Sequence, residues 1–269
     1  MKLSEELQWR GFVNQMTFDD ISKVDTPRKF YFGVDPSADS MQIGNLAAAM
    51  MVRLFMEYGH EAYLLVGGAT GMIGDPDGKK DEREVRDANV VAHNVECISA
   101  QYRRVFEGRD FHLVNNADWF RNINYIDFLY KVGKYMSMTQ LLDREFVQAR
   151  IGEGGSGISY AEFSYSLMQG YDFLHLFREH GVTLQVCGAD QWGNSTTGVS
   201  LIRKLEGGEA HVYSVPLVIN KATGRKFGKS EGGAIWLDEN KTSVYKFYQF
   251  WLNVDDDGVI DYMKMYTTL

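Results

Sequence analysis

The sequence predicts an α/β protein, and three strand-to-turn transitions carry the prediction. Residues 30–34 are mostly aromatic or β-branched and indicate a strand, which breaks at Asp35-Pro36 before a long apolar helix. Residues 61–66 indicate a second strand that runs into a glycine-rich loop, and residues 184–187 a third that runs into GADQWGN. Where a helix starts after such a turn, its free N–H groups can bind an anion. An ordinary strand–helix unit without a ligand fits the same pattern equally well.

The remaining elements follow from apolar spacing. Further helices are expected over 3–14, 85–105, 160–178, 242–253 and 256–267, further strands over 111–115 and 214–219, and short helices within 124–150, before a flexible break at 152–157. On the long helix over 160–178, Tyr165, Gln169 and Asp172 share one face. A polar stripe on a core helix is either a buried hydrogen-bonded network or the wall of a ligand site.

Composition narrows the class of protein and its compartment. The chain has 269 residues, 45% of them apolar and 24% charged, which indicates a folded globular protein. Its net charge of −8 provides no general attraction for nucleic acid, so any such contact needs a local basic patch. The two cysteines have neither metal-site nor disulfide spacing, and we find no signal peptide or membrane-spanning run. A cytoplasmic protein without a membrane segment is expected.

Two loops combine glycines with cations. Four glycines between 67 and 74 precede Asp75, and cations follow at 79, 80 and 83. The spacing excludes a Walker A loop, because three residues rather than four separate the last glycines and no hydroxyl follows the lysine. The loop over 220–231 (NKATGRKFGKSE) carries four more cations. Both loops suit a phosphate clamp, and both equally suit a solvated surface. Asp190, in GADQWGN, could face a ligand or simply cap the next helix.

Several motifs, taken in order, resemble those of one family. GVDPSADSMQIGN resembles the nucleotide-binding motif of class I aminoacyl-tRNA synthetases, in its bacterial tyrosyl-tRNA synthetase form, and KFGKS resembles the second class I motif. VGGATGMIGDP, FSYSLMQGYD and GADQWGN resemble the tyrosine-enzyme blocks between them. The resemblance covers nearly the whole chain. It implies a Rossmann-like parallel sheet with a helical insertion at about 116–157 and linking helices at about 242–269. The family's anticodon-binding and C-terminal RNA-binding domains are expected to be absent.

The resemblance also implies a reaction and partners. L-tyrosine would react with ATP, accompanied by Mg²⁺, to give tyrosyl-adenylate and pyrophosphate, before transfer to tRNA(Tyr). No protein-held metal and no tightly bound cofactor are expected. Arg203 and Lys204 match positions where the family contacts the tRNA acceptor arm. The family is homodimeric through the insertion and the region near Tyr160, so a homodimer is expected.

Individual roles carry over from the family motifs, residue by residue. Tyr31 and Asp172 would bind the phenol hydroxyl of the substrate, and Gln191 its carboxyl group. Asp75, Tyr165 and Gln169 would hold its ammonium group. The expected ATP-binding residues are Asp35, Ser37, Gly44, Gly188, Asp190, Leu217 and Val218, the last two near adenine. The expected catalytic residues are Gln42, Asn45, Lys79, Arg83, Lys226 and Lys229, with the four cations clamping pyrophosphate.

This sequence departs from the family pattern in its first motif. The family usually has His-x-Gly-His where this chain has Gln42 and Asn45 around Gly44. Gln42 keeps an amide donor but loses an imidazolium charge, which affects the expected rate more than the reaction. Phe32 replaces a cysteine that often touches the ribose. Two alternatives therefore stay open: a degenerate synthetase-like protein that binds nucleotide or RNA with little catalysis, and an unrelated nucleotidyltransferase with the same fold.

Overall fold

A six-stranded sheet forms the centre of the protein in the computed structural model, which describes residues 1–76, 86–221, 224, 227, 229–230 and 233–269. The strand order is β1-β6-β5-β2-β3-β4, and only the β1–β6 pair is antiparallel. The strands are β1 (Gln15–Met16), β2 (Lys29–Val34), β3 (Glu61–Val66), β4 (Phe111–Asn115), β5 (Leu184–Gly188) and β6 (His211–Val215). The predicted α/β class with a parallel sheet is confirmed.

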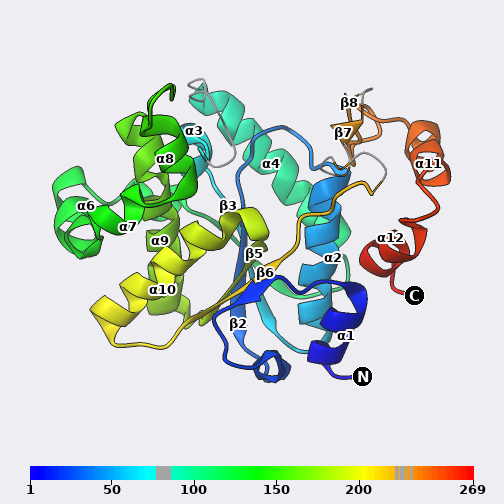
Figure 1. The fold of residues 1–269 in the computed structure, drawn as a ribbon, viewed down its shortest axis with the longest axis horizontal. Helices are drawn as coiled ribbons and strands as arrows, with labels where there is room; N and C mark the ends of the chain where they lie inside the picture. The colour runs from blue at the N-terminus through cyan, green and yellow to red at the C-terminus, as the bar shows by residue number, and fades with distance from the viewer. Residues whose placement is uncertain (77–85, 222–223, 225–226, 228, 231–232) are drawn as a thin grey trace.

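Helices cover both faces of this sheet (Figure 1). The helices are α1 (Leu3–Arg10), α2 (Ile43–Glu57), α3 (Thr70–Ile73), α4 (Ala88–Val105), α5 (Ala117–Phe120), α6 (Tyr125–Lys131), α7 (Met138–Leu142), α8 (Glu145–Ile151), α9 (Tyr160–His180), α10 (Trp192–Glu206), α11 (Val244–Leu252) and α12 (Val259–Tyr266). One face packs against α2 and α4, and the other against α9 and α10. The short helices α5 to α8 fall within the stretch predicted as an insertion.

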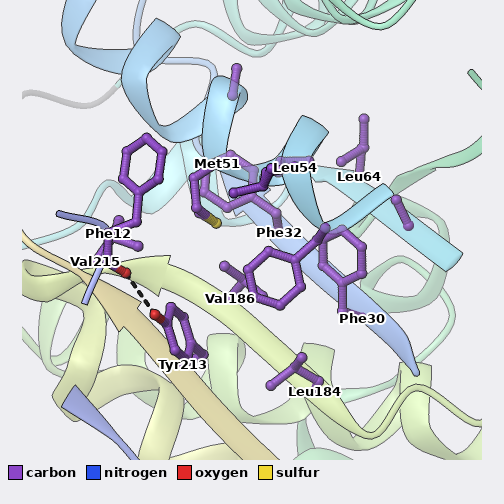
Figure 2. Packing of buried hydrophobic residues seen from close by; sticks show 14 of the residues in the cluster. Phe12, Phe30, Phe32, Met51, Leu54, Leu64, Leu184, Val186, Tyr213 and Val215 are labelled. Atoms are coloured by element: carbon purple, nitrogen blue, oxygen red, sulfur yellow. Dashed lines mark hydrogen bonds between the residues drawn. The ribbon is translucent and has the colours of Figure 1, made fainter. Parts of the chain in front are cut away.

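Strand alternation decides which side chains meet which helices. Phe30 and Phe32 of β2 point toward α2, with Val186 of β5 beside them, and Figure 2 shows this core. Tyr31, between the two phenylalanines, therefore points to the opposite face, where it packs in the cluster formed with α9. Its ring centroid lies 5.3 Å from that of Phe173. Strand alternation therefore places the Tyr31 side chain on the face of the sheet that packs against α9.

The strand order also locates the site. The chain runs outward from β2 to β3 and β4 on one side, and from β5 to β6 on the other. Connections therefore leave β2 and β5 in opposite directions, which opens a crevice at the carboxyl ends of these two neighbours. Asp35 follows β2 there, and Gly188 ends β5.

Two elements differ most from the sequence prediction. The strand expected at 214–219 lies at His211–Val215, in register with β5, and it ends before Pro216, which has no N–H to donate. The first helix ends at Arg10 rather than at residue 14, because Gly11 adopts a left-handed conformation with φ of 75°. The edge strand β1, only two residues long, was not predicted.

The C-terminal helices return to the start of the chain. Arg10 of α1 is nearly buried and donates to the main-chain oxygens of Lys264 and Thr267, at 2.6 and 2.8 Å. In Figure 1 the C-terminus accordingly lies beside α1. None of the helices in the described part of the chain combines the length and the apolar character needed to cross a membrane.

Candidate active site

A pocket of about 380 Å³ opens at the carboxyl ends of β2 and β5. It brings together all the residues expected to bind the amino acid and all those expected to bind ATP, with Gln42 and Asn45. They are Tyr31, Asp35, Ser37, Gln42, Gly44, Asn45, Asp75, Tyr165, Gln169, Asp172, Gly188, Asp190, Gln191, Leu217 and Val218. Phe32 and Ala48 also line it. Their individual roles stay predictions.

The other four expected catalytic residues cannot be placed in the same way. Lys79, Arg83 and Lys226 lie outside the described residues. Lys229 begins the two-residue strand β7 (Lys229–Ser230), of which only the backbone is described. The basic clamp on the phosphates therefore stays a prediction.

Tyr31 and Asp172 form the deep end of the pocket. They are only 1% and 2% exposed, respectively. The Tyr31 hydroxyl has no hydrogen-bond partner among the described residues, and burial, reinforced by the Asp172 charge, raises its pKa well above the ordinary value. A buried hydroxyl without a partner is costly unless a ligand completes it. The deep end is therefore suited to a ligand that carries a polar group.

Two donors that sequence reasoning missed orient the Asp172 carboxyl group. Trp119 Nε1 donates to Oδ1 at 2.8 Å, and Asn116 Nδ2 donates to Oδ2 at 3.1 Å. Burial nevertheless raises the pKa of Asp172 to about 8, against the opposing effect of the two donors. Asn116 is itself fully buried. The sequence did contain a signal for Asn116: it follows directly after the predicted strand 111–115, and ligands bind at the carboxyl ends of parallel strands.

The network continues from Asn116 to the first motif. Asn116 Nδ2 donates to Thr70 Oγ1 at 2.9 Å, and Thr70 donates to Asp35 Oδ1 at 2.8 Å. The Tyr165 hydroxyl donates to Asp35 Oδ2, also at 2.8 Å, and burial raises its pKa well above the ordinary value. Tyr165 and Asp172 of the polar stripe on α9 thus belong to a buried network, and the stripe also lines the pocket, while its role in binding a ligand stays a prediction.

Asp75 and Gln191 meet across the mouth of the amino-acid end. Gln191 Nε2 donates to Asp75 Oδ2 at 2.5 Å. Asp75 follows Gly74, whose φ of 81° turns the chain after α3 and favours glycine. The main-chain oxygen of Gln191 accepts from Ser195 Oγ at 2.8 Å, which ties it to the first turn of α10. A carboxylate and an amide here could receive an ammonium group and a carboxylate.

The other end of the pocket is made from backbone and helix starts. Gln42 is the N-cap residue of α2, and its N–H donates to Asn45 Oδ1 at 3.0 Å. At Gly188 a Cβ atom would come within 2.8 Å of Asp190 Oδ1, so a side chain here would displace the Asp190 carboxyl group. Gln191, without a side-chain cap bond, is the N-cap of α10, so the capping interpretation of Asp190 is wrong. These features suit phosphate and ribose groups.

Segments flanking the basic loop join the start of α2. Ile43 N–H donates to Ile235 O, and Leu237 N–H to Met41 O, both at 2.9 Å. Within the loop, Phe227 N–H donates at 2.8 Å to the main-chain oxygen of Val218 on the preceding flank, and the Phe227 ring is buried. β7 pairs with β8 (Gly233–Ala234), which leads directly into this junction. Phe227, within KFGKS, lies beside the first motif, because a Cβ atom at Gly44 would come within 3.5 Å of the Phe227 main-chain oxygen.

Comparison with known proteins identifies the class. Residues 23–269 match the family described as tRNA synthetases class I (W and Y), and the chain belongs to this family.

Within that class, the chain is similar to tyrosine enzymes. It is 47% identical over 271 residues to a tyrosine–tRNA ligase of Latilactobacillus sakei, with 98% of this chain and 64% of the relative covered. It is 46% identical over 277 residues to a tyrosine–tRNA ligase 2 of Bacillus cereus, with 100% of this chain and 65% of the relative covered. The chain thus spans about 64–65% of the length of these curated relatives.

Solved structures agree on the fold. A C-terminally truncated mitochondrial tyrosyl-tRNA synthetase of Aspergillus nidulans superposes with a TM-score of 0.86 at 29% identity, over 100% of this chain and 80% of that one. The Archaeoglobus fulgidus tyrosyl-tRNA synthetase complexed with L-tyrosine gives a TM-score of 0.72 at 16% identity, covering 99% and 81%, and supports the fold alone.

Proposed function

We propose that the chain is the catalytic region of a tyrosine–tRNA ligase, which activates L-tyrosine with ATP and transfers it to tRNA(Tyr). The observation that carries this proposal is the buried pair of Tyr31 and Asp172 at the deep end of the pocket. A phenol hydroxyl placed there would complete the unpaired Tyr31 hydroxyl and meet an oriented carboxyl group. The names of the curated relatives support the same activity.

The proposed reaction needs no covalent bond to the protein. One carboxylate oxygen of tyrosine attacks the α-phosphorus of ATP, and the bond from that phosphorus to the pyrophosphate oxygen breaks. A carboxylate is already a nucleophile, so catalysis reduces to positioning and to stabilising charge on the phosphates. Asp75, Tyr165 and Gln169 would hold the ammonium group. Gln42, Asn45 and the cations of the two loops would act on the phosphates.

Mg²⁺ enters the proposal as a companion of ATP. Within the described ranges, no three or more His, Cys, Asp or Glu side chains are grouped to hold a metal ion. The phosphate oxygens of ATP are themselves good Mg²⁺ ligands, and the ion usually keeps several waters. The metal would neutralise charge on the phosphates as pyrophosphate leaves.

ATP–pyrophosphate exchange with and without L-tyrosine tests the activation step. We expect exchange that depends on tyrosine, and a preference over phenylalanine of about 10⁴-fold or more, because a site built to hydrogen-bond a hydroxyl is left unpaired by the analogue. Nucleotide binding without exchange would instead favour the degenerate synthetase-like protein. Exchange that ignores tyrosine would favour an unrelated nucleotidyltransferase.

The tRNA is proposed to approach by its acceptor arm. Arg203 and Lys204 are exposed in the last turn of α10, and Lys204 Nζ donates to Tyr135 O at 2.9 Å. With a net charge of −8, attraction to RNA should depend on such local cations and should weaken with salt. Charging of tRNA(Tyr) transcripts at several salt concentrations tests this, and salt-independent charging would contradict it.

A homodimer and a cytoplasmic location complete the proposal. Large apolar side chains are exposed on and near the predicted insertion: Tyr125, Ile126, Tyr130 and Tyr160. Such a patch is typical of an interface. Sedimentation at micromolar concentration tests it, and Ile126→Glu should shift the protein toward monomer. Cys97 and Cys187 are both free thiols, which suits a reducing compartment.

A further inference from the structure

A chain of hydrogen bonds runs from the predicted insertion into the pocket. Arg144, the N-cap residue of α8, donates from Nη1 to Asn194 Oδ1 at 2.8 Å. Asn194 Nδ2 donates to Gln191 Oε1 at 3.2 Å, and Gln191 Nε2 donates to Asp75 Oδ2 at 2.5 Å. Gln191 and Asp75 line the pocket. The insertion is thereby connected to the residues proposed to receive the amino acid.

The two ends of this chain fix its direction. A guanidinium group can only donate, and an ionised carboxylate can only accept. Each amide between them must turn its oxygen toward Arg144 and its N–H toward Asp75. If either Asn194 or Gln191 turned over, like groups would face each other and two hydrogen bonds would be lost. The charge of Arg144 therefore sets the orientation of an amide two residues further along the network.

The stability of α10 does not explain why the Arg144 guanidinium lies at the start of this helix. Arg144 Nη2 also donates to Gly193 O at 2.8 Å and to Thr197 Oγ1 at 2.5 Å, so the guanidinium lies against the first turns of α10. The N-terminal end of a helix carries partial positive charge and favours acidic side chains. α10 has no acidic residue in its first turn. Asn194, the link to Gln191, is 4% exposed and so cannot exchange its partners for water freely.

We propose that Arg144, acting through Asn194, is a positioning residue for the amino-acid substrate. It holds Gln191 with its N–H groups toward Asp75 and the substrate carboxylate, and with its oxygen turned away. In the opposite orientation, Oε1 would repel both carboxylates. The proposal deepens the proposed function and rests on it. It predicts an effect on tyrosine and none on ATP.

The test uses four variants in the exchange assay, with thermal melting of each, and Arg144→Lys is the conservative one. Arg144→Met removes the donors and keeps the side-chain length. Asn194→Asp still accepts from Arg144 but cannot donate to Gln191, so it breaks the chain without releasing the insertion. Arg178→Met is the matched control, because it removes a guanidinium that pairs with Glu206 between α9 and α10, away from the pocket.

We expect a rise of about tenfold in the KM for tyrosine with Arg144→Met and Asn194→Asp, the order of one lost hydrogen bond, with the KM for ATP unchanged. Arg144→Lys, still a donor-only cation, should recover most of the loss. Arg178→Met should resemble the wild type in both KM values.

A wild-type KM for tyrosine in Asn194→Asp would overturn the inference, and so would an equal rise in the KM for ATP. If Arg144→Met lowers the melting temperature, the KM for tyrosine of Asn194→Asp alone tests the inference, because that variant keeps the contact with Arg144. Failure of the proposed function looks different: the wild-type protein itself would show no tyrosine-dependent exchange. Calorimetry could then still compare the tyrosine affinity of the wild type with that of the Arg144 variants.

Discussion

The two ends of the pocket differ in the kind of group that lines them. The amino-acid end consists of buried side chains bonded to one another, such as Asp172 with Asn116 and Trp119. The nucleotide end consists of helix starts, the end of β5 at Gly188, and the flanks of a basic loop. A buried side-chain network can reject a substrate that lacks one polar group, whereas backbone N–H groups and cations stabilise the charge that develops on the phosphates. Specificity and rate are therefore expected to depend on opposite ends.

The largest effect expected at the nucleotide end comes from the KFGKS lysines. Lys226→Ala or Lys229→Ala should slow adenylate formation by about 100-fold or more, the order seen when one group that stabilises transition-state charge is lost. Tyrosine affinity should hardly change, because the lysines act as pyrophosphate leaves. Single-turnover kinetics with tyrosine titration separate the two quantities. A loss of tyrosine affinity at an unchanged chemical rate would mean that this loop is not a phosphate clamp.

The matching change at the amino-acid end is Asp172→Asn. It should lower the preference for tyrosine over phenylalanine by about 100-fold, because its NH₂ group would face one of the two donors, Asn116 or Trp119, and lose that hydrogen bond. Asp190→Asn, the same isosteric change at the nucleotide end, should raise the KM for ATP and leave the preference alone. The measurement is kcat/KM for both amino acids. If both variants lowered the preference equally, the division of labour between the two ends would be wrong.

Sequence reasoning reached the two ends unequally, for a physical reason. Tyr31, carried over from the family motifs, and the residues of the first motif all line the pocket, and the strand–turn–helix pattern around them is local and visible in the sequence. The partners of Asp172 were missed, since Trp119 and Asn116 lie 53 and 56 residues away along the chain. Local periodicity carries no information on such contacts. Arg144 was missed in the same way, because only the packing of α8 near α10 brings it to Asn194.

The protonation of Asp172 gives a third prediction. Burial raises its pKa from 3.8 to about 8, so between these values the folded protein holds a proton that the unfolded chain has released. Stability from this group is therefore full below pH 4, falls as the pH rises toward 8, and is lost above it, with a slope of at most about 1.4 kcal/mol per pH unit. The drop in melting temperature between pH 5 and pH 8 should be smaller in Asp172→Asn than in the wild type. Equal drops would show that Asp172 titrates normally.

The smallest effect concerns Gln42, where the chain departs from the family pattern at the nucleotide end. Its Oε1 is buried without a partner among the described residues, while its backbone bridges to Trp236 beside the basic loop. Histidine would remove that unpaired oxygen and add a charged donor when protonated, so Gln42→His should raise the activation rate about two- to fivefold without changing tyrosine affinity. Gln42→Met, which cannot donate, is the control and should lower the rate. If Gln42→His were slower than the wild type, the glutamine would be adapted to its own surroundings, and its Oε1 would then be expected to meet the nucleotide.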